Sequence, residues 1–252
     1  MTSRAWRLSA LVSVVALILA MTTACGSATT TTAPTGAHEH GAAELGPGGT
    51  RPLEPVLLDA GEKLQVVATT NIVGDVVRNV GGDRIDLTTL MGIGVDPHSY
   101  VPTPSDTAAV HDAHLVFASG AGLEADLEEM FDSAGGEAAV VHLSDGLDLL
   151  APLEDRESGY QDDEHEYGDI DPHVWFSVPN VIHWTEEIQD ALSTLDPENA
   201  GSFQENADAY GHELEELDAW VQQQVAQIPA ENRKLVTNHP TFGYFADRYG
   251  LE

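Results

Sequence analysis

The sequence predicts an α/β protein with two lobes of mostly parallel sheet joined by one long helix, in which the second lobe is incomplete. Between residues 61 and 196, short apolar runs alternate with amphipathic segments, the order that parallel strands and crossover helices produce. From residue 197 to residue 228, apolar side chains recur at steps of three and four and form one helical stripe. Residues 229–252 hold one strand pattern and one helix pattern, too little to bury a separate core.

The first segment, residues 1–24, is predicted to be a signal peptide. Arg4 and Arg7 precede an apolar run from Leu8 to Met21, which is shorter than the about 20 residues of a membrane-spanning helix. Small residues then lead directly into Cys25, a pattern that resembles a bacterial lipobox and implies cleavage before Cys25 and acylation of its thiol. An ordinary signal peptide with an incidental cysteine is the alternative. Because Cys25 is the only cysteine, an internal disulfide and a cluster of thiolate metal ligands are excluded.

The next segment, residues 25–60, is predicted to be a flexible tether. It is rich in Thr, Ala, Gly and Pro, which bury too little apolar surface to offset the entropy lost on ordering. His38 and His40 lie in this tether, and we interpret them as incidental, with loose capture of a metal ion as the alternative.

The N-terminal lobe, residues 61–196, is predicted to alternate strands with helices. Its first helix is expected to end at Gly81 and Gly82, since glycine is common at the C-terminal cap of a helix. Its second is expected to begin at Ser105, whose hydroxyl suits an N-terminal cap. The predicted strands are Leu64 to Thr69, Ile85 to Met91, Leu115 to Ala118 and Ala138 to Leu143, and the predicted helices are Ile72 to Val80, residues 105–114 and Leu123 to Phe131.

An acidic loop interrupts this alternation at residues 154–171. The segment contains many Asp and Glu residues together with His165, and few side chains that can pack into a core. We therefore expect it to be solvated.

A long linking helix is predicted over residues 197–228. Asp196 suits the N-terminal cap, Pro197 suits the first helical position, and Pro229 ends the stripe. At about 1.5 Å per residue this helix would be roughly 48 Å long, more than a small domain needs. We interpret it as a spacer between two lobes, with a coiled-coil partner helix as the alternative.

The last segment, residues 229–252, is expected to be the start of a C-terminal lobe. Lys234 to Thr237 is predicted to be a strand, and Phe242 to Tyr249 a helix capped by Gly250. We expect the chain to be truncated before this lobe is complete.

The charge balance excludes one class of function. Lys and Arg number 10 whereas Asp and Glu number 42, which gives a formal net charge of −32. This chain lacks the basic surface of a nucleic-acid-binding protein. Its acidity attracts cations without selecting among them, and a solvated surface that favours solubility is the plainer interpretation.

Three of the eleven histidines share one local setting. Each lies on a loop stiffened by a neighbouring proline, and the three are His98, His173 and His239. His98 and His239 follow predicted strands, and ligands of open parallel sheets bind beyond the carboxyl ends of strands. Imidazole is a favoured zinc ligand, and three imidazoles leave one tetrahedral position for a carboxylate or a water. Asp96 and Asp171 are suited to accept the second ring N–H of a nearby histidine and to fix its tautomer.

The other histidines of the predicted lobes are assigned no metal-binding role. His111, His114, His183 and His212 are expected on helix surfaces among polar neighbours, and His142 is expected to be packed within an apolar strand.

Four blocks of sequence occur in the order typical of one family. They are VVATTNIVGDVVRNVGGDRIDLTTLMGIGVDPHSYVPTPSD at Val66 to Asp106, DPHVW at Asp171 to Trp175, DPENAGSFQENADAY at Asp196 to Tyr210, and TNHPTFGYFADRYGL at Thr237 to Leu251. Together they resemble the metal-binding lipoproteins of ABC importers, the ZnuA/TroA-like family. This resemblance implies two α/β lobes joined by one long helix, with the metal ion held between the lobes.

The resemblance also implies a site and partners. His98, His173 and His239 would be metal ligands, and the usual fourth ligand, an acidic residue late in the second lobe, would lie beyond Glu252. The protein would be extracytoplasmic and anchored to the bacterial cell membrane through a lipid on Cys25. It would work as a monomer with an ABC permease and its ATPase.

Zinc is the expected cargo, captured outside the membrane and delivered to the permease, with manganese as the alternative. In manganese-binding relatives the third ligand is commonly a carboxylate, whereas here it is His239, and imidazole suits zinc better than manganese. The acidic loop around His165 also resembles a loop of zinc-specific members. A zinc enzyme that activates a metal-bound water is a second hypothesis, but the sequence suggests no general base, so we expect no enzymatic activity. A role as an adhesin or an extracellular metal buffer stays open.

Overall fold

The computed structural model describes residues 52–152 and 170–252 of the chain. The predicted signal peptide, Cys25, most of the predicted tether and residues 154–169 of the acidic loop, with His38, His40 and His165, lie outside these ranges. Within these ranges, none of the helices combines the length and the apolar character that crossing a membrane requires.

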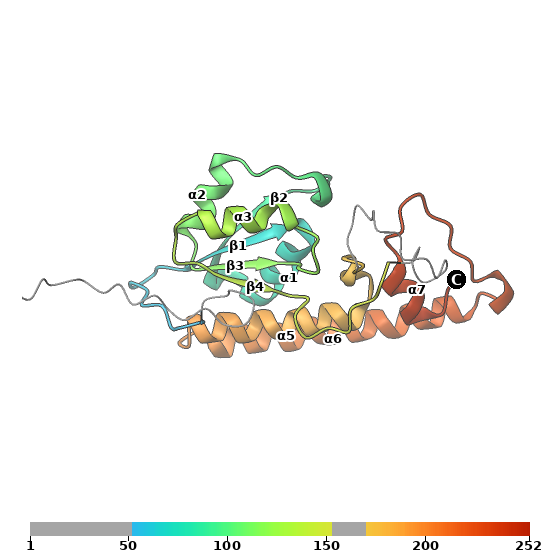
Figure 1. Cartoon of the computed structure of the whole chain (residues 1–252). Helices are drawn as coiled ribbons and strands as arrows, with labels where there is room; N and C mark the ends of the chain where they lie inside the picture. The colour runs from blue at the N-terminus through green and yellow to red at the C-terminus, as the bar shows by residue number, and fades with distance from the viewer. Residues whose placement is uncertain (1–51, 153–169) are drawn as a thin grey trace, which may run out of the picture. The chain divides into compact units, whose positions relative to one another are not determined.

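A parallel four-stranded sheet forms the centre of the N-terminal region, with the strand order β2-β1-β3-β4 (Figure 1). β1 (Leu64–Thr70) pairs with β2 (Ile85–Met91) and with β3 (Leu115–Ala118), and β4 (Ala139–His142) pairs with β3. The two central strands are buried on both faces, which explains why they read as nearly continuous apolar runs. The predicted α/β class with a parallel sheet is therefore confirmed.

Helices cover both faces of the sheet (Figure 1). Val66 and Phe117 pack on one face with α1 (Asn71–Gly81), α5 (Val178–Leu195) and the start of α6 (Ala200–Ala226). Val67 and Val116 pack on the other face with α2 (Pro104–Asp112) and α3 (Ala125–Ser133). Adjacent residues of a strand point to opposite faces, so each central strand contributes to both cores. Short 3-10 turns lie at η1 (Gly82–Arg84), η2 (Pro97–Ser99), η3 (Val174–Phe176) and η4 (Ala230–Asn232).

The predicted N-terminal cap of α2, Ser105, is wrong. The N-terminal cap is Thr103, whose hydroxyl accepts a hydrogen bond from the backbone N–H of Asp106, while the Asp106 carboxylate accepts one from the backbone N–H of Thr103. This reciprocal capping box satisfies two backbone donors, whereas a cap at Ser105 would satisfy one. The helix therefore begins two residues earlier in the chain than its predicted cap implied.

The predicted start of α6 is also wrong. Asp196 is the C-terminal cap of α5, and its carboxylate accepts hydrogen bonds from the backbone N–H and the side-chain amide of Asn199. These bonds form a turn that includes Pro197, so α6 begins only at Ala200. Asp and Asn favour such local turns because their short side chains bond to nearby backbone groups.

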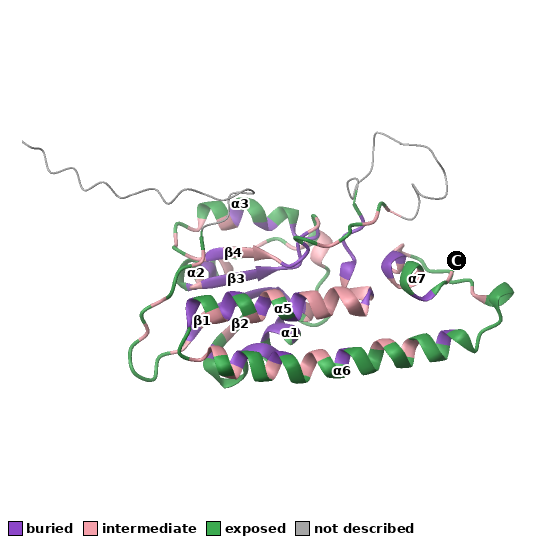
Figure 2. Cartoon of the chain, turned by 90° about the horizontal axis from the view of Figure 1, so that it is seen from below, coloured by how far each residue is buried: buried purple, intermediate pink, exposed green. Residues whose placement is uncertain are grey.

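No bounds were predicted for α5, an 18-residue helix, although His183 within it was expected on a helix surface. Trp184, Ile188 and Leu192 are buried at steps of four residues along it. In the structure α5 lies beside α6 (Figures 1 and 2), and Phe203 and Ala207 of α6 belong to the same core. The first half of the long helix therefore packs in the core of the α/β region, a role that its interpretation as a spacer between two lobes did not include.

The predicted strand from Lys234 to Thr237 is wrong, because no strand forms there. The side chain of Val236 is 94% exposed. Backbone pairing is limited to two bonds, from the N–H of Leu235 to the carbonyl of Glu252 and from the N–H of Glu252 to the carbonyl of Arg233, each 2.7 Å long. This is the slanted pattern of a single parallel bridge, and a strand needs such pairing along its length.

The predicted last helix is present as α7 (Gly243–Tyr249). Gly250 follows it with a φ of 73°, the left-handed conformation that glycine adopts without strain, so the predicted cap is confirmed.

Candidate metal centre

His98 is placed by a tight turn after the end of β2. It lies on η2, where the carboxylate of Asp96 accepts hydrogen bonds from the backbone N–H of His98 and from the hydroxyl of Ser99, both 3.0 Å long. These two bonds lower the pKa of Asp96 below its ordinary value, because they stabilise the charged carboxylate. The turn fixes the backbone of His98 and leaves its imidazole half-buried.

His173 is placed by a buried carboxylate at the entry to α5. One oxygen of Asp171 accepts a hydrogen bond from the backbone N–H of His173 at 3.0 Å and lies 2.8 Å from its Nδ1. The side chains of the two residues are only 6% and 2% exposed. A neutral imidazole that donates from Nδ1 carries its lone pair on Nε2, so Asp171 orients Nε2 as a metal ligand. The role predicted for Asp171 agrees with this geometry.

His239 lies on the segment between α6 and α7. Its backbone carbonyl accepts hydrogen bonds from the N–H of Thr241 and from the hydroxyl of Thr237, both 2.8 Å long. The two bonds close a turn around Pro240, and the histidine side chain is half-buried. Residues 234–237, which come just before this histidine, form no strand. Of the two histidines predicted to follow a strand, only His98 does so.

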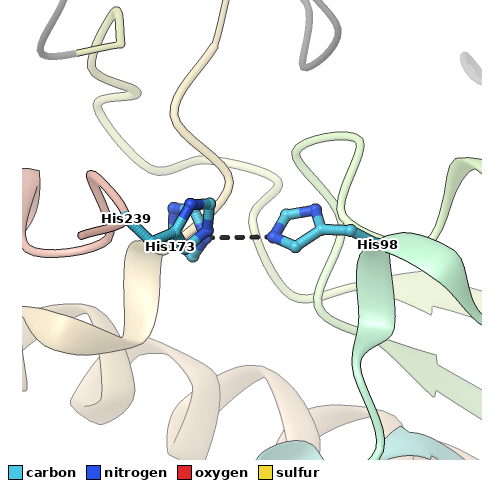
Figure 3. Close-up of side chains that lie close together, drawn as sticks. All are labelled: His98, His173 and His239. Carbon is cyan, nitrogen blue, oxygen red and sulfur yellow. Dashed lines mark hydrogen bonds between the residues drawn. The ribbon is translucent and has the colours of Figure 1, made fainter.

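The three imidazoles converge on one point from three separate segments (Figure 3). Nε2 of His98 and Nε2 of His173 are 3.2 Å apart, and one ligand atom from each of the three rings lies within 4.8 Å of the others. Tetrahedral zinc with bonds of about 2.0–2.1 Å places its ligand nitrogens roughly 3.3–3.4 Å apart. Across residues 52–152 and 170–252, this is the one group of three or more His, Cys, Asp or Glu residues whose ligand atoms lie close enough together to hold a metal ion.

The electrostatics of the cluster favour a neutral imidazole at His98. Burial and the neighbouring His173 and His239 lower the pKa of His98, and Asp96 opposes that shift. A protonated His98 beside a second protonated ring would place like charges within a few ångströms of each other. Because metal ligation requires neutral imidazole, the cluster holds His98 in the form that binds a metal ion.

Aromatic side chains surround the cluster. The ring of Trp175 packs edge-on against His173 with centroids 5.5 Å apart, and the ring of Phe176 lies 4.5 Å from that of Phe242. No role at the site was predicted for these aromatic residues and Tyr244, although each lies within five positions of a predicted ligand. Their nearness in sequence to His173 and His239 was the available signal.

The remaining described histidines lie outside this group. His111 and His212 are exposed on their helices, as predicted. His114 and His183 are half-buried and hydrogen-bonded to backbone groups, and His183 lies on α5 whereas His114 lies outside the helix predicted for it. His142 is half-buried on β4, so it is less enclosed than predicted.

Comparison with protein families identifies the class of this chain. Residues 66–252 match the ZnuA family model, described as zinc-uptake complex component A, periplasmic. The chain therefore belongs to the ZnuA family of metal-binding solute-binding proteins.

Curated relatives agree with this assignment. Over 192 residues, 76% of this chain and 60% of the relative, the chain is 37% identical to the manganese-binding lipoprotein MntA of Halalkalibacterium halodurans. Over 198 residues, 76% of this chain and 61% of the relative, it is 34% identical to the manganese ABC transporter substrate-binding lipoprotein PsaA of Streptococcus pneumoniae. Both relatives are named as binding lipoproteins, and the name of PsaA also assigns it to an ABC transporter. The chain spans about 60% of their length.

Solved structures carry the same fold. The periplasmic zinc binding protein TroA from Treponema pallidum is 34% identical with a TM-score of 0.65, covering 76% of this chain and 65% of that protein. A metal-free mutant of the periplasmic metal binding protein from Candidatus Liberibacter asiaticus is 27% identical with a TM-score of 0.68, covering 76% of this chain and 67% of that protein.

Proposed function

We propose that this protein captures a divalent metal ion as cargo for an ABC importer, with His98, His173 and His239 as ligands. The observation that carries the proposal is the convergence of the three imidazoles, whose ligand atoms lie within 4.8 Å of one another. The burial of apolar surface does not explain why three polar rings from three separate segments meet in a partly solvated site, in T-shaped pairs. A metal ion gives that arrangement a function, and family membership supports it.

Zinc is the proposed cargo. The relatives MntA and PsaA are named for manganese, whereas TroA from Treponema pallidum is named a zinc binding protein. The donor set of this chain favours zinc, because three imidazole nitrogens are softer donors than the oxygen ligands that manganese prefers. His239 is the deciding position, because it supplies a nitrogen donor where a carboxylate would suit manganese.

The proposed location is the outer side of the bacterial cell membrane, through a lipid on Cys25 and beside an ABC permease and its ATPase. The relatives that are named lipoproteins support this proposal, as does the lipobox-like sequence before Cys25. A Cys25→Ala variant should be released from the membrane fraction or remain unprocessed. Retention of the mature variant in the membrane would contradict the anchor.

The test of the ligand set is a competition titration with Zn²⁺ and a chromophoric chelator. We expect His98→Ala, His173→Ala and His239→Ala each to weaken zinc binding by at least a hundredfold, or about 3 kcal/mol. His212→Ala is the matched control, because the side chain of His212 is 71% exposed on α6. A ligand variant that binds zinc as tightly as the control would remove that residue from the site.

The same titration tests the choice of metal. Replacing the third imidazole in His239→Glu should lower the ratio of zinc affinity to manganese affinity, since it introduces an oxygen donor. An unchanged ratio would show that His239 does not decide which metal ion is bound.

A further inference from the structure

The hydroxyl of Tyr244, on α7, joins two segments that lie far from it in sequence. It donates a hydrogen bond to the backbone carbonyl of Asp171 and accepts one from the backbone N–H of Leu150, both 3.0 Å long. The Tyr244 side chain is only 4% exposed. These two bonds are called the Tyr244 bridge. Buried hydrogen bonds are costly to lose, because water does not replace the missing partner.

The bridge ends on the residue that orients one of the proposed metal ligands. Asp171 accepts from Tyr244 through its backbone carbonyl and holds His173 through its carboxylate, 2.8 Å from Nδ1. The backbone N–H of Asp171 donates to the carbonyl of Leu150 at 2.8 Å. Leu150, Asp171 and Tyr244 are therefore joined by a closed ring of three hydrogen bonds, and Asp171 also contacts the His173 imidazole.

The bridge also begins close to another proposed ligand. Tyr244 lies five positions after His239 in the sequence, at the start of α7. The intervening Phe242 packs on Phe176, three positions after His173, with ring centroids 4.5 Å apart. The segment that carries His239 is thus attached to the segment that carries His173 by this aromatic contact and by the Tyr244 bridge, in addition to the contact between the two histidine rings.

We propose that Tyr244 is a positioning residue for metal capture, which sets the distance between the His239 and His173 imidazoles through the Tyr244 bridge. The inference rests on the proposed function, because it assigns Tyr244 a part in the same three-histidine site. Tyr244 does not touch the metal ion. By holding the segment that carries His239 in place, Tyr244 reduces the conformational entropy that this segment loses when a metal ion binds. Side chains that are already in place bind a metal ion more tightly.

The test compares two phenylalanine substitutions in the same helix. Tyr244→Phe removes the bridge, whereas Tyr249→Phe removes a hydroxyl that donates to Asp218 on α6 at 2.9 Å. In a Zn²⁺ competition titration, we expect Tyr244→Phe to bind zinc about tenfold more weakly and Tyr249→Phe to stay within about twofold of the unchanged chain. Equal weakening by both variants would mean general loosening of α7 and would overturn the proposal.

His173→Ala in the same titration separates the two claims. If His173→Ala loses zinc while Tyr244→Phe binds as tightly as the unchanged chain, the positioning role is wrong and the proposed function stands. If His173→Ala also binds normally, the proposed function itself is wrong. Far-ultraviolet circular dichroism establishes that each variant is folded.

A measurement on the unchanged chain covers the case in which Tyr244→Phe does not fold. Coupling between two events in a protein is reciprocal, so zinc should stabilise the bridge by the factor that the bridge contributes to zinc binding. We expect saturating Zn²⁺ to slow hydrogen exchange at the Leu150 amide about tenfold. The same exchange rate with and without zinc would overturn the proposal.

Discussion

The α/β region and the segment from residue 230 to residue 252 hold their proposed metal ligands in different ways. In the α/β region, Phe117 of β3 is fully buried, between helices and neighbouring strands. In the C-terminal segment, the regular structure consists of the short 3-10 turn η4 and the seven-residue helix α7. Val236 in this segment is 94% exposed. Figure 2 shows this contrast, with exposed residues along much of the segment and of the adjoining part of α6.

The difference means that the third histidine depends on a small number of contacts. His98 follows a strand of the sheet, and His173 lies at the entry to a helix packed in the core. His239 is held by contacts of neighbouring residues of its own segment, chiefly Phe242 and Tyr244. Ordering each backbone residue costs about 1–2 kcal/mol, so a loosely held segment would lose much of its ligand's contribution to metal binding.

The largest expected effect breaks the core of the α/β region. Phe117→Ala should lower the free energy of unfolding by about 3–5 kcal/mol, because it removes a fully buried ring and leaves a cavity. Val236→Ala is the control in the exposed segment and should stay within about 0.5 kcal/mol. Urea denaturation followed by circular dichroism measures both. Similar losses of unfolding free energy for the two variants would show that the two regions do not differ in how tightly they are packed.

An intermediate effect is expected where α7 meets α6. The carboxylate of Asp218 accepts hydrogen bonds from the Arg248 guanidinium and the Tyr249 hydroxyl. Asp218→Asn should lower the free energy of local opening of the last turn of α7 by about 1 kcal/mol. The effect is no larger because the side chain of Arg248 is 38% exposed and solvent weakens its ion pair with Asp218. Hydrogen exchange at residues 247–250 should quicken while the midpoint of global unfolding stays nearly constant. A large shift of that midpoint would show that α7 unfolds together with the core.

The same contact predicts a dependence on pH. Burial alone would raise the pKa of Asp218, but the hydrogen bonds from Arg248, Tyr249 and Gln222 outweigh it and lower the pKa. A lowered pKa in the folded state gives stability that is present above the ordinary aspartate pKa and is lost as the pH falls through the folded value. Exchange protection at residues 247–250, corrected for intrinsic rates, should therefore fall on acidification below about pH 4. Asp218→Asn should show a much flatter profile.

The smallest expected effect tests a cap in the α/β region. Thr103→Ala removes the hydroxyl that caps α2 and should cost about 1 kcal/mol or less of unfolding free energy. Ser105→Ala, two positions on, is the matched control and should change little, since Ser105 is exposed inside the first turn. A greater loss at Ser105 would restore the cap predicted from the sequence.

The strands of the sheet were predictable because burial on both faces leaves a continuous apolar run, as in Leu115–Ala118. Residues 234–237 show a similar apolar pattern and form no strand, because pairing there is limited to the single bridge at Glu252. The bounds of α5 were not predicted, because the Asp196-Pro197 signal was interpreted only as the start of the long helix that follows it. That signal marks the turn between two helices instead.

The sequence by itself determined the candidate ligands of this protein. The prolines beside His98, His173 and His239 are local features, as is the aspartate two positions before each of the first two. Only the tertiary structure decided that the three rings meet, that the backbone of Asp171 is bound by Tyr244, and that α6 runs beside a second helix. The reason is physical. A turn or a cap is set by neighbouring residues, whereas His98 and His173 are 75 residues apart and meet only through the packing between them.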